Sequence, residues 1–143
     1  MIITKETDYA LRILRVLLDG EKHSVAEMSE TELIPTQFAY QILRKLSAGN
    51  LVQVSRGALG GCALSCDLDA TSLYDLMGVM GERGVLCACM EPGYECRWQD
   101  EHGRCAIHCQ LAALQRKQDE AFRTVSLRRL LTGKSDPQDT SEL

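Results

Sequence analysis

The chain has 143 residues and a formal net charge of −4, and 45% of its residues are hydrophobic but only 5% aromatic. This length predicts one domain with at most an appended element, and the composition predicts a core made mostly of Leu, Ile, Val and Ala. No apolar run approaches the ~18 residues of a membrane span, which excludes a membrane-spanning protein. The opening residues also lack the basic and then apolar pattern of a secretory signal, so we expect a cytoplasmic protein.

Charged residues are distributed unevenly along the chain. Residues 34–66 contain no Asp or Glu but include Arg44, Lys45 and Arg56, whereas the stretches on both sides are acidic. A carboxylate-free surface on an acidic protein is what contact with phosphates requires. On charge alone, a chance distribution is the alternative interpretation.

Two short helices are predicted in the first part of the chain. Residues 4–18 form the first, with Thr4 as its cap and a face of leucines. Ser24 and Glu27 form a capping box that opens the second helix. Pro35 separates this second helix from the next one.

A third helix is predicted over residues 36–48, where Gly49 and Asn50 end it. Its buried face is expected to carry Phe38, Ile42 and Leu46. Its other face offers side chains that can reach base edges or phosphates, namely Gln37, Tyr40, Gln41, Arg44 and Lys45. Two short helices joined by a tight turn are typical of a helix-turn-helix, but an ordinary amphipathic helix fits this segment equally well.

A β-hairpin is predicted directly after the third helix. Residues 51–55 and 62–65 read as short strands, and residues 56–61 form a glycine-rich turn that begins with Arg56. A hairpin in this position indicates a winged helix, and an arginine at its tip can enter a minor groove. The glycines lack the spacing of a nucleotide-binding loop, and no helix opens after them.

The C-terminal half is predicted to contain one long helix. Residues 71–81 form a short helix, residues 106–124 the long one, residues 125–131 a last turn and residues 132–143 a frayed tail. One side of the long helix carries an apolar stripe, namely Ile107, Leu111, Leu114, Ala121 and Phe122. Such a stripe predicts packing on a second copy in a two-fold dimer, with packing against the chain's own core as the alternative.

Cysteines gather between the two C-terminal helices. Residues 87–109 hold five of the seven cysteines and two of the three histidines. Between residues 91 and 104 there is neither helical nor strand periodicity, so a loop is predicted. A loop of this length in a small domain is usually functional or disordered, and clustered thiols favour a function.

Several chemistries could use this loop. Disulfides belong to oxidising compartments, and structural zinc favours closely spaced cysteine pairs. An iron–sulfur cluster accepts thiolates spread along a flexible loop, and Cys89, Cys96 and Cys105, with His108 close by, have a suitable spacing. A metal-free thiol sensor is the further alternative.

These features together resemble the IscR/NsrR (Rrf-two) family of bacterial winged-helix regulators. The resemblance lies in the opening IITKETDYALRIL, in the pattern IP-x4-YQIL-x2-L, in the wing RGALGG, and in three loop cysteines followed by a long helix. It covers roughly residues 2–131. The wing and the cysteine loop together make it specific, which the helix-turn-helix alone would not be.

The resemblance implies a homodimer that binds double-stranded operator DNA, with the third helix in the major groove and the wing in the minor groove. The DNA-binding residues would then be Thr36, Gln37, Tyr40, Gln41, Arg44 and Arg56. It also implies that Cys89, Cys96 and Cys105 ligate an iron–sulfur cluster together with a fourth ligand.

The fourth ligand divides the family. IscR-like members resemble this chain at Cys105-x2-His108 and hold a 2Fe–2S cluster. NsrR-like members resemble it around Asp8, where an aspartate of the partner's first helix ligates a 4Fe–4S cluster. The chain has both features, and we favour His108 and 2Fe–2S, with Asp8 or Cys109 as alternatives.

The sequence therefore predicts a mainly α fold with a small β-hairpin wing (α+β). The expected divisions are a DNA-binding domain (residues 1–84), a cluster-binding loop (85–105), a dimerisation helix (106–131) and a flexible tail (132–143). The expected function is a repressor whose operator binding depends on the cluster, with a cluster-free thiol sensor or an electron-transfer protein as alternatives. No enzyme and no small-molecule substrate are expected, because no paired acid and base or activated nucleophile is present.

Overall fold

The computed structural model describes residues 2–82 and 84–134, so most of the predicted tail lies outside the described residues. The elements in chain order are α1 (Lys5–Val16), the 3₁₀ turn η1 (Leu17–Asp19), α2 (Val25–Glu32), α3 (Thr36–Ala48), β1 (Val52–Ser55), β2 (Gly61–Leu64), α4 (Leu73–Met80), η2 (Ala88–Met90), α5 (Arg97–His102), α6 (Ala106–Arg123) and α7 (Leu127–Thr132). None of the helices in this part of the chain is long and apolar enough to cross a membrane. The predicted α+β fold class, mainly helical with a two-stranded hairpin, is confirmed.

Local side-chain caps determine where the first helices begin. The Thr4 hydroxyl accepts a hydrogen bond from the backbone N–H of Glu6 at 3.2 Å. At α2 the predicted capping box is present, because the backbone N–H of Ser24 donates to Glu27 at 2.8 Å and the N–H of Glu27 donates back at 3.2 Å. Each of these bonds satisfies a backbone donor that has no partner within its helix.

The core lies where α1, α3 and α4 meet the base of the hairpin. Ile13, Leu14, Ile42, Leu46 and Leu76 are fully buried there. Burying side chains of this size contributes roughly 1.5–3 kcal/mol each to folding. This packing fixes α3 relative to the hairpin, which positions the surface described below.

One predicted core residue on α3 is wrong. Phe38 is 46% exposed, and Ala39 takes its place in the core. The buried face runs through Ala39, Ile42 and Leu46, and successive helical residues lie 100° apart. Phe38 therefore lies at the rim, with its ring centroid 6.2 Å from that of Tyr9.

The hairpin is an antiparallel pair anchored to the rest of the domain. Val54 pairs with Cys62 in its register. A second bridge joins Cys62 to His23, ahead of α2, through bonds of 2.8 and 3.0 Å. The tip requires glycine, because Gly57 has φ of 102° and a Cβ at Gly60 would lie 2.5 Å from the Ser55 carbonyl oxygen.

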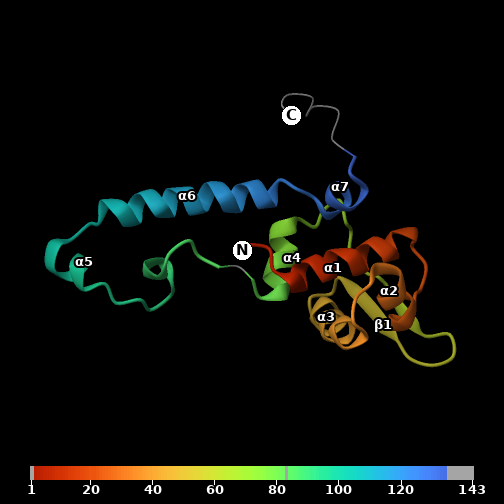
Figure 1. Ribbon diagram of the computed structural model, residues 1–143. Coiled ribbons are helices and arrows are strands. Elements are labelled where there is room, and N and C mark those ends of the chain that lie inside the picture. The colour runs from red at the N-terminus through yellow and green to blue at the C-terminus, as the bar shows by residue number, and fades with distance from the viewer. Residues whose placement is uncertain (1, 83, 135–143) are drawn as a thin grey trace.

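Figure 1 shows α6 extending away from the winged-helix part, with α5 at its outer end. In the described chain α6 has no buried residue, and Ile107 and Leu114 are 72% and 52% exposed. The chain then returns, because Leu127 of α7 is fully buried and its backbone N–H donates to the Thr71 carbonyl at 2.8 Å. The long helix thus contacts α4 near its C-terminal end and leaves Ile107 and Leu114 of its apolar stripe exposed.

The segment predicted as a loop contains a helix that the sequence pattern did not reveal. Within α5, Arg97 forms an ion pair with Glu101 at 2.8 Å, and the Trp98 and His102 rings stack with centroids 4.8 Å apart. Both pairs are four residues apart, the spacing that stabilises one helical face. Gly103, with φ of 81°, ends the helix.

Candidate functional site

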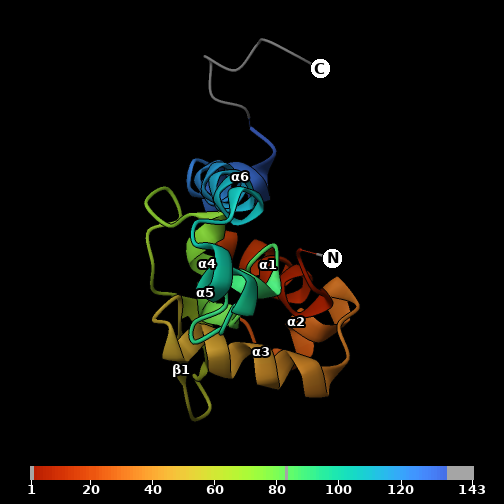
Figure 2. The same ribbon diagram turned by 90° about the vertical axis from the view of Figure 1, so that its left-hand side faces the viewer.

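The exposed face of α3 and the hairpin form one surface. In Figures 1 and 2 both lie on the side of the molecule away from α6. All six residues predicted to bind DNA are exposed, namely Thr36, Gln37, Tyr40, Gln41, Arg44 and Arg56. A helix and a hairpin presented side by side can occupy adjacent major and minor grooves.

A groove of about 370 Å³ separates α3 from the hairpin. Tyr40 and Arg44 line it from α3, and Val54 and Arg56 line it from the hairpin. Within residues 2–82 and 84–134, neither Arg44 nor Arg56 forms a salt bridge with a carboxylate. Both guanidinium groups are therefore available to phosphates or bases.

Lys45, which was expected on the same face as Arg44, is oriented elsewhere. Its ammonium forms an ion pair with the Glu6 carboxylate and donates to the Met80 carbonyl at 3.2 Å. It therefore ties α3 to α1 and to the end of α4. The lack of Asp and Glu in residues 34–66 indicated a basic region. It could not show that Glu6, outside these residues, would form an ion pair with Lys45.

The cysteine segment meets the beginning of α6. The Cys89 sulfur lies 3.3 Å from the His108 Nδ1 atom. Cys105 is the N-cap of α6, and its sulfur accepts a hydrogen bond from the His108 backbone N–H at 3.5 Å. Three of the four predicted ligands are thus brought together from two parts of the chain.

Cys96, the remaining predicted cysteine ligand, is the N-cap of α5. The pKa of Cys89 is raised by its hydrogen bond with Cys87, then by burial, and then by the negative charges of Cys87, Cys96 and Cys105. Among the described residues, the Cys96 side chain forms no hydrogen bond with Cys89, Cys105 or His108. In the part of the chain that the structure describes, no three His, Cys, Asp or Glu side chains are gathered as a single metal ion requires.

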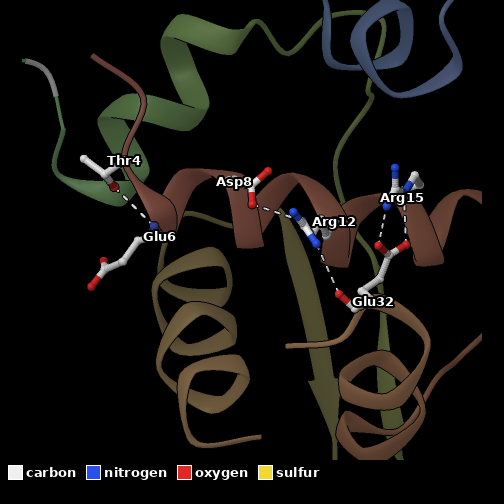
Figure 3. Close-up of polar contacts among 6 residues, drawn as sticks. All are labelled: Thr4, Glu6, Asp8, Arg12, Arg15 and Glu32. Carbon is white, nitrogen blue, oxygen red and sulfur yellow. Dashed lines mark hydrogen bonds and ion pairs between the residues drawn. The ribbon is translucent and has the colours of Figure 1, made fainter. Parts of the chain in front are cut away.

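Asp8, the alternative fourth ligand, lies on α1 and has a partner there. Figure 3 shows its carboxylate joined to Arg12, at 3.0 Å. The same helix is held to α2 by Arg15, whose guanidinium donates to the Glu32 carboxylate. Within this chain Asp8 does not join the cysteine segment, so it could serve as a ligand only to a partner's cluster.

The remaining cysteines differ in their surroundings. Burial raises the pKa of the Cys62 and Cys66 thiols, which favours unreactive structural roles. Cys109, another alternative ligand, accepts a hydrogen bond from the Arg104 Nε atom at 3.2 Å. Cys87 was not predicted in any role, although its spacing from Cys89 was a signal that the two thiols could touch.

A helix-turn-helix followed by an anchored hairpin, with Arg44 and Arg56 lining the groove between them, defines a winged-helix DNA-binding protein. Residues 3–133 match the Rrf2 family, described as "Iron-dependent Transcriptional regulator". The chain belongs to this family of transcriptional regulators, as the resemblance predicted. "Protein aau3" of Rhizobium meliloti (strain 1021) is 31% identical over 125 residues, which cover 85% of this chain and 77% of that protein.

Solved structures share the fold at lower identity. The T. potens IscR structure matches with a TM-score of 0.68 and 15% identity, covering 98% of this chain and 93% of that one. CymR of B. subtilis, described as "the Global Cysteine Regulator", matches with a TM-score of 0.65 and 19% identity, covering 93% and 98%. The oxidised form of Staphylococcus aureus CymR gives 0.65 and 18%, covering 95% and 99%.

Proposed function

We propose that the protein is a dimeric repressor whose operator binding is controlled by an iron–sulfur cluster held by Cys89, Cys96, Cys105 and His108. The observation that carries the proposal is the contact between Cys89 and His108, 3.3 Å apart. It joins the segment leaving the winged-helix part to the beginning of α6. A cofactor at this point would link the winged-helix part to α6, the helix through which we propose that two copies associate.

The donor set fits such a cluster. Thiolates are the usual ligands of iron–sulfur clusters, and imidazole can replace thiolate on one iron. A 2Fe–2S cluster divides its ligands between two irons, so they need not converge on one point as for a single ion. When bound, the cluster would supply a redox-active and oxidation-sensitive group.

For DNA recognition we propose α3 as the major-groove helix, with Gln37, Tyr40 and Gln41 toward base edges. Arg56 would enter the minor groove from the wing, and Thr36 and Arg44 would contact the backbone or flanking bases. The exposure of all these side chains supports this assignment. A narrow minor groove attracts an arginine through its negative potential.

We further propose that two copies associate through α6. In one chain the helix leaves Ile107 and Leu114 exposed on its apolar stripe. Two copies related by a two-fold axis would cover the same stripe on both chains. The cluster state can then alter operator affinity only through different affinities for two arrangements of the recognition helices.

A cluster-free thiol sensor is the second candidate. Five thiols of the cysteine segment are partly accessible in the described chain, namely Cys87, Cys89, Cys96, Cys105 and Cys109. The fold is also shared with CymR, whose oxidised form has been solved. An electron-transfer protein is less well supported, because the exposed arginines and the groove have no role in it.

The test is the visible and Mössbauer spectrum of anaerobically purified protein, with operator shift assays of the same sample. We expect an iron–sulfur chromophore that Cys96→Ala abolishes. Cys66→Ala is the matched control and should retain it, because its thiol lies outside the segment. A colourless, iron-free wild type whose DNA binding still responds to oxidants would replace the cluster sensor by the thiol sensor.

A further inference from the structure

The pair Cys87 and Cys89 has a geometry that the cluster site does not use. Cys87 is extended, with φ of −147° and ψ of 154°, and the turn η2 follows it at once. The backbone N–H of Met90 donates to the Cys87 carbonyl at 3.1 Å and closes this turn. The turn brings both side chains to one side, with the sulfur atoms 3.1 Å apart.

No other pair of thiols is hydrogen-bonded in the described part of the chain. Cys105 and Cys109 are also close in sequence, but the Cys105 sulfur accepts from the His108 backbone and Cys109 accepts from Arg104. Both Cys87 and Cys89 are partly accessible. A small oxidant can therefore reach either sulfur and find the second one already in contact.

We propose that Cys87 and Cys89 form a dithiol that a peroxide converts into a disulfide when no cluster is bound. One thiol attacks the peroxide O–O bond and becomes a sulfenic acid, and a water molecule leaves. The second thiol then displaces the hydroxyl from that sulfur, and a second water leaves as the S–S bond forms. The two sulfurs lose two electrons and two hydrogens in total, and the peroxide is reduced to two waters.

The consequence for regulation rests on the proposed function, because Cys89 is also a proposed cluster ligand. In the disulfide its sulfur is bonded to Cys87 and can no longer supply a thiolate ligand beside His108. Oxidised protein therefore cannot take up a cluster until a thiol reductant reopens the bond. Cys87 would then protect Cys89 in the cluster-free protein, because a thiol reductant can reverse the disulfide but not the over-oxidation of Cys89.

The first experiment reads the covalent state alone. Cluster-free protein receives one equivalent of hydrogen peroxide, remaining thiols are alkylated under denaturing conditions, and cleavage after Glu82 and Glu95 releases residues 83–95. Cys87 and Cys89 are the only cysteines of this peptide. We expect it unalkylated and lighter by two hydrogens, and Cys87→Ser should abolish that species while Cys66→Ser retains it.

Other products would overturn the proposal: a disulfide that includes Cys96 or Cys105, a stable sulfenic acid, or full alkylation of both cysteines. The second experiment measures chromophore formation on reconstitution with iron and sulfide. Peroxide-treated wild type should fail to load until dithiothreitol is added, and reduced Cys87→Ser should load normally. Loading of the disulfide form would overturn the consequence. If the reduced wild type never takes up a cluster, the proposed function is wrong. The disulfide is then tested by the mass of the 83–95 peptide alone.

Discussion

At the scale of single residues, His108 distinguishes the two possible clusters. It would be the fourth ligand of a 2Fe–2S cluster, whereas Asp8 would be that of a 4Fe–4S cluster. Its Nδ1 atom lies 3.3 Å from the Cys89 sulfur, whereas Asp8 is engaged with Arg12 at 3.0 Å. We expect His108→Ala to perturb a 2Fe–2S Mössbauer signal and Asp8→Ala to leave it unchanged. Asp8→Ala should cost only about 0.5 kcal/mol of stability, as for an exposed helical ion pair.

A histidine ligand must be neutral at the ligating nitrogen, so it competes with protons. Cluster retention in the wild type should therefore weaken as the pH falls. His108→Cys should keep a cluster but change this pH dependence, because a thiolate with its own affinity for protons replaces the imidazole. A 4Fe–4S signal that Asp8→Ala perturbs would assign the site to both chains of a dimer.

Arg56 is the second decisive residue, because it stands at the wing without a carboxylate partner among the described residues. We expect Arg56→Ala to weaken operator binding by about 1–3 kcal/mol if the side chain reads the groove. Arg116→Ala removes the same charge from exposed α6 and should have a smaller effect. Affinities for operator and unrelated DNA, measured at one moderate salt concentration, distinguish the two. Equal operator affinity in Arg56→Ala and wild type would contradict the assignment.

At the scale of elements, α6 shows which features a period of apolar residues can predict. The helix, its beginning after Cys105 and its apolar stripe all followed from the sequence. The period could not show that α5 precedes it, because this short helix has no apolar period and is stabilised by pairs of its own side chains. Nor could it separate Phe38 from Ala39, since neighbours differ by only 100° on a helix. Lys45 was misplaced for another reason, because its partner Glu6 is remote in sequence.

The exposed stripe of α6 leads to a prediction about assembly. Leu114 is 52% exposed in one chain, so Leu114→Glu should leave the monomer folded. In a two-fold seam it would bury a charge without a partner, which is costly. We expect sedimentation analysis to show a dimer for wild type and a monomer for Leu114→Glu. Arg116→Glu, two residues along and on the opposite side, should remain dimeric. A wild type that sediments as a monomer at micromolar concentration would contradict the dimer.

At the scale of the whole molecule, α6 and the cysteine segment meet the winged-helix part beside α4. A cavity of about 550 Å³ lies between α4, α6 and the segment, with Tyr74, Glu82 and Phe122 in its lining. The Arg123 guanidinium lies 3.8 Å from the Tyr74 ring centroid across this junction. We expect α6 to be able to shift relative to α4 here, because the cavity leaves room that a closely packed interior would not.

Glu82 is the point at which such a shift would reach α1. Its carboxylate accepts hydrogen bonds from the Thr4 and Thr7 hydroxyls, and Thr7 is fully buried. It follows α4 after one residue, Gly81. The last residue of α4, Met80, accepts through its carbonyl a hydrogen bond from Lys45 of α3. The contacts therefore run from Glu82, ahead of the cysteine segment, through α1 and α4 to α3.

We expect Glu82→Gln to reduce the effect of the cluster on operator affinity more than it reduces affinity itself. Neutral glutamine keeps the shape but replaces charge-assisted bonds, which are about twice as strong as neutral ones. Stability should fall by about 1 kcal/mol, measurable by urea unfolding. Coupling is the ratio of operator affinities with and without cluster, which in regulated proteins amounts to roughly 5–150-fold. Glu120→Gln, an exposed change on α6, should leave that ratio as in wild type. If Glu82→Gln also leaves it unchanged, the signal reaches α3 by another route, such as the dimer seam itself.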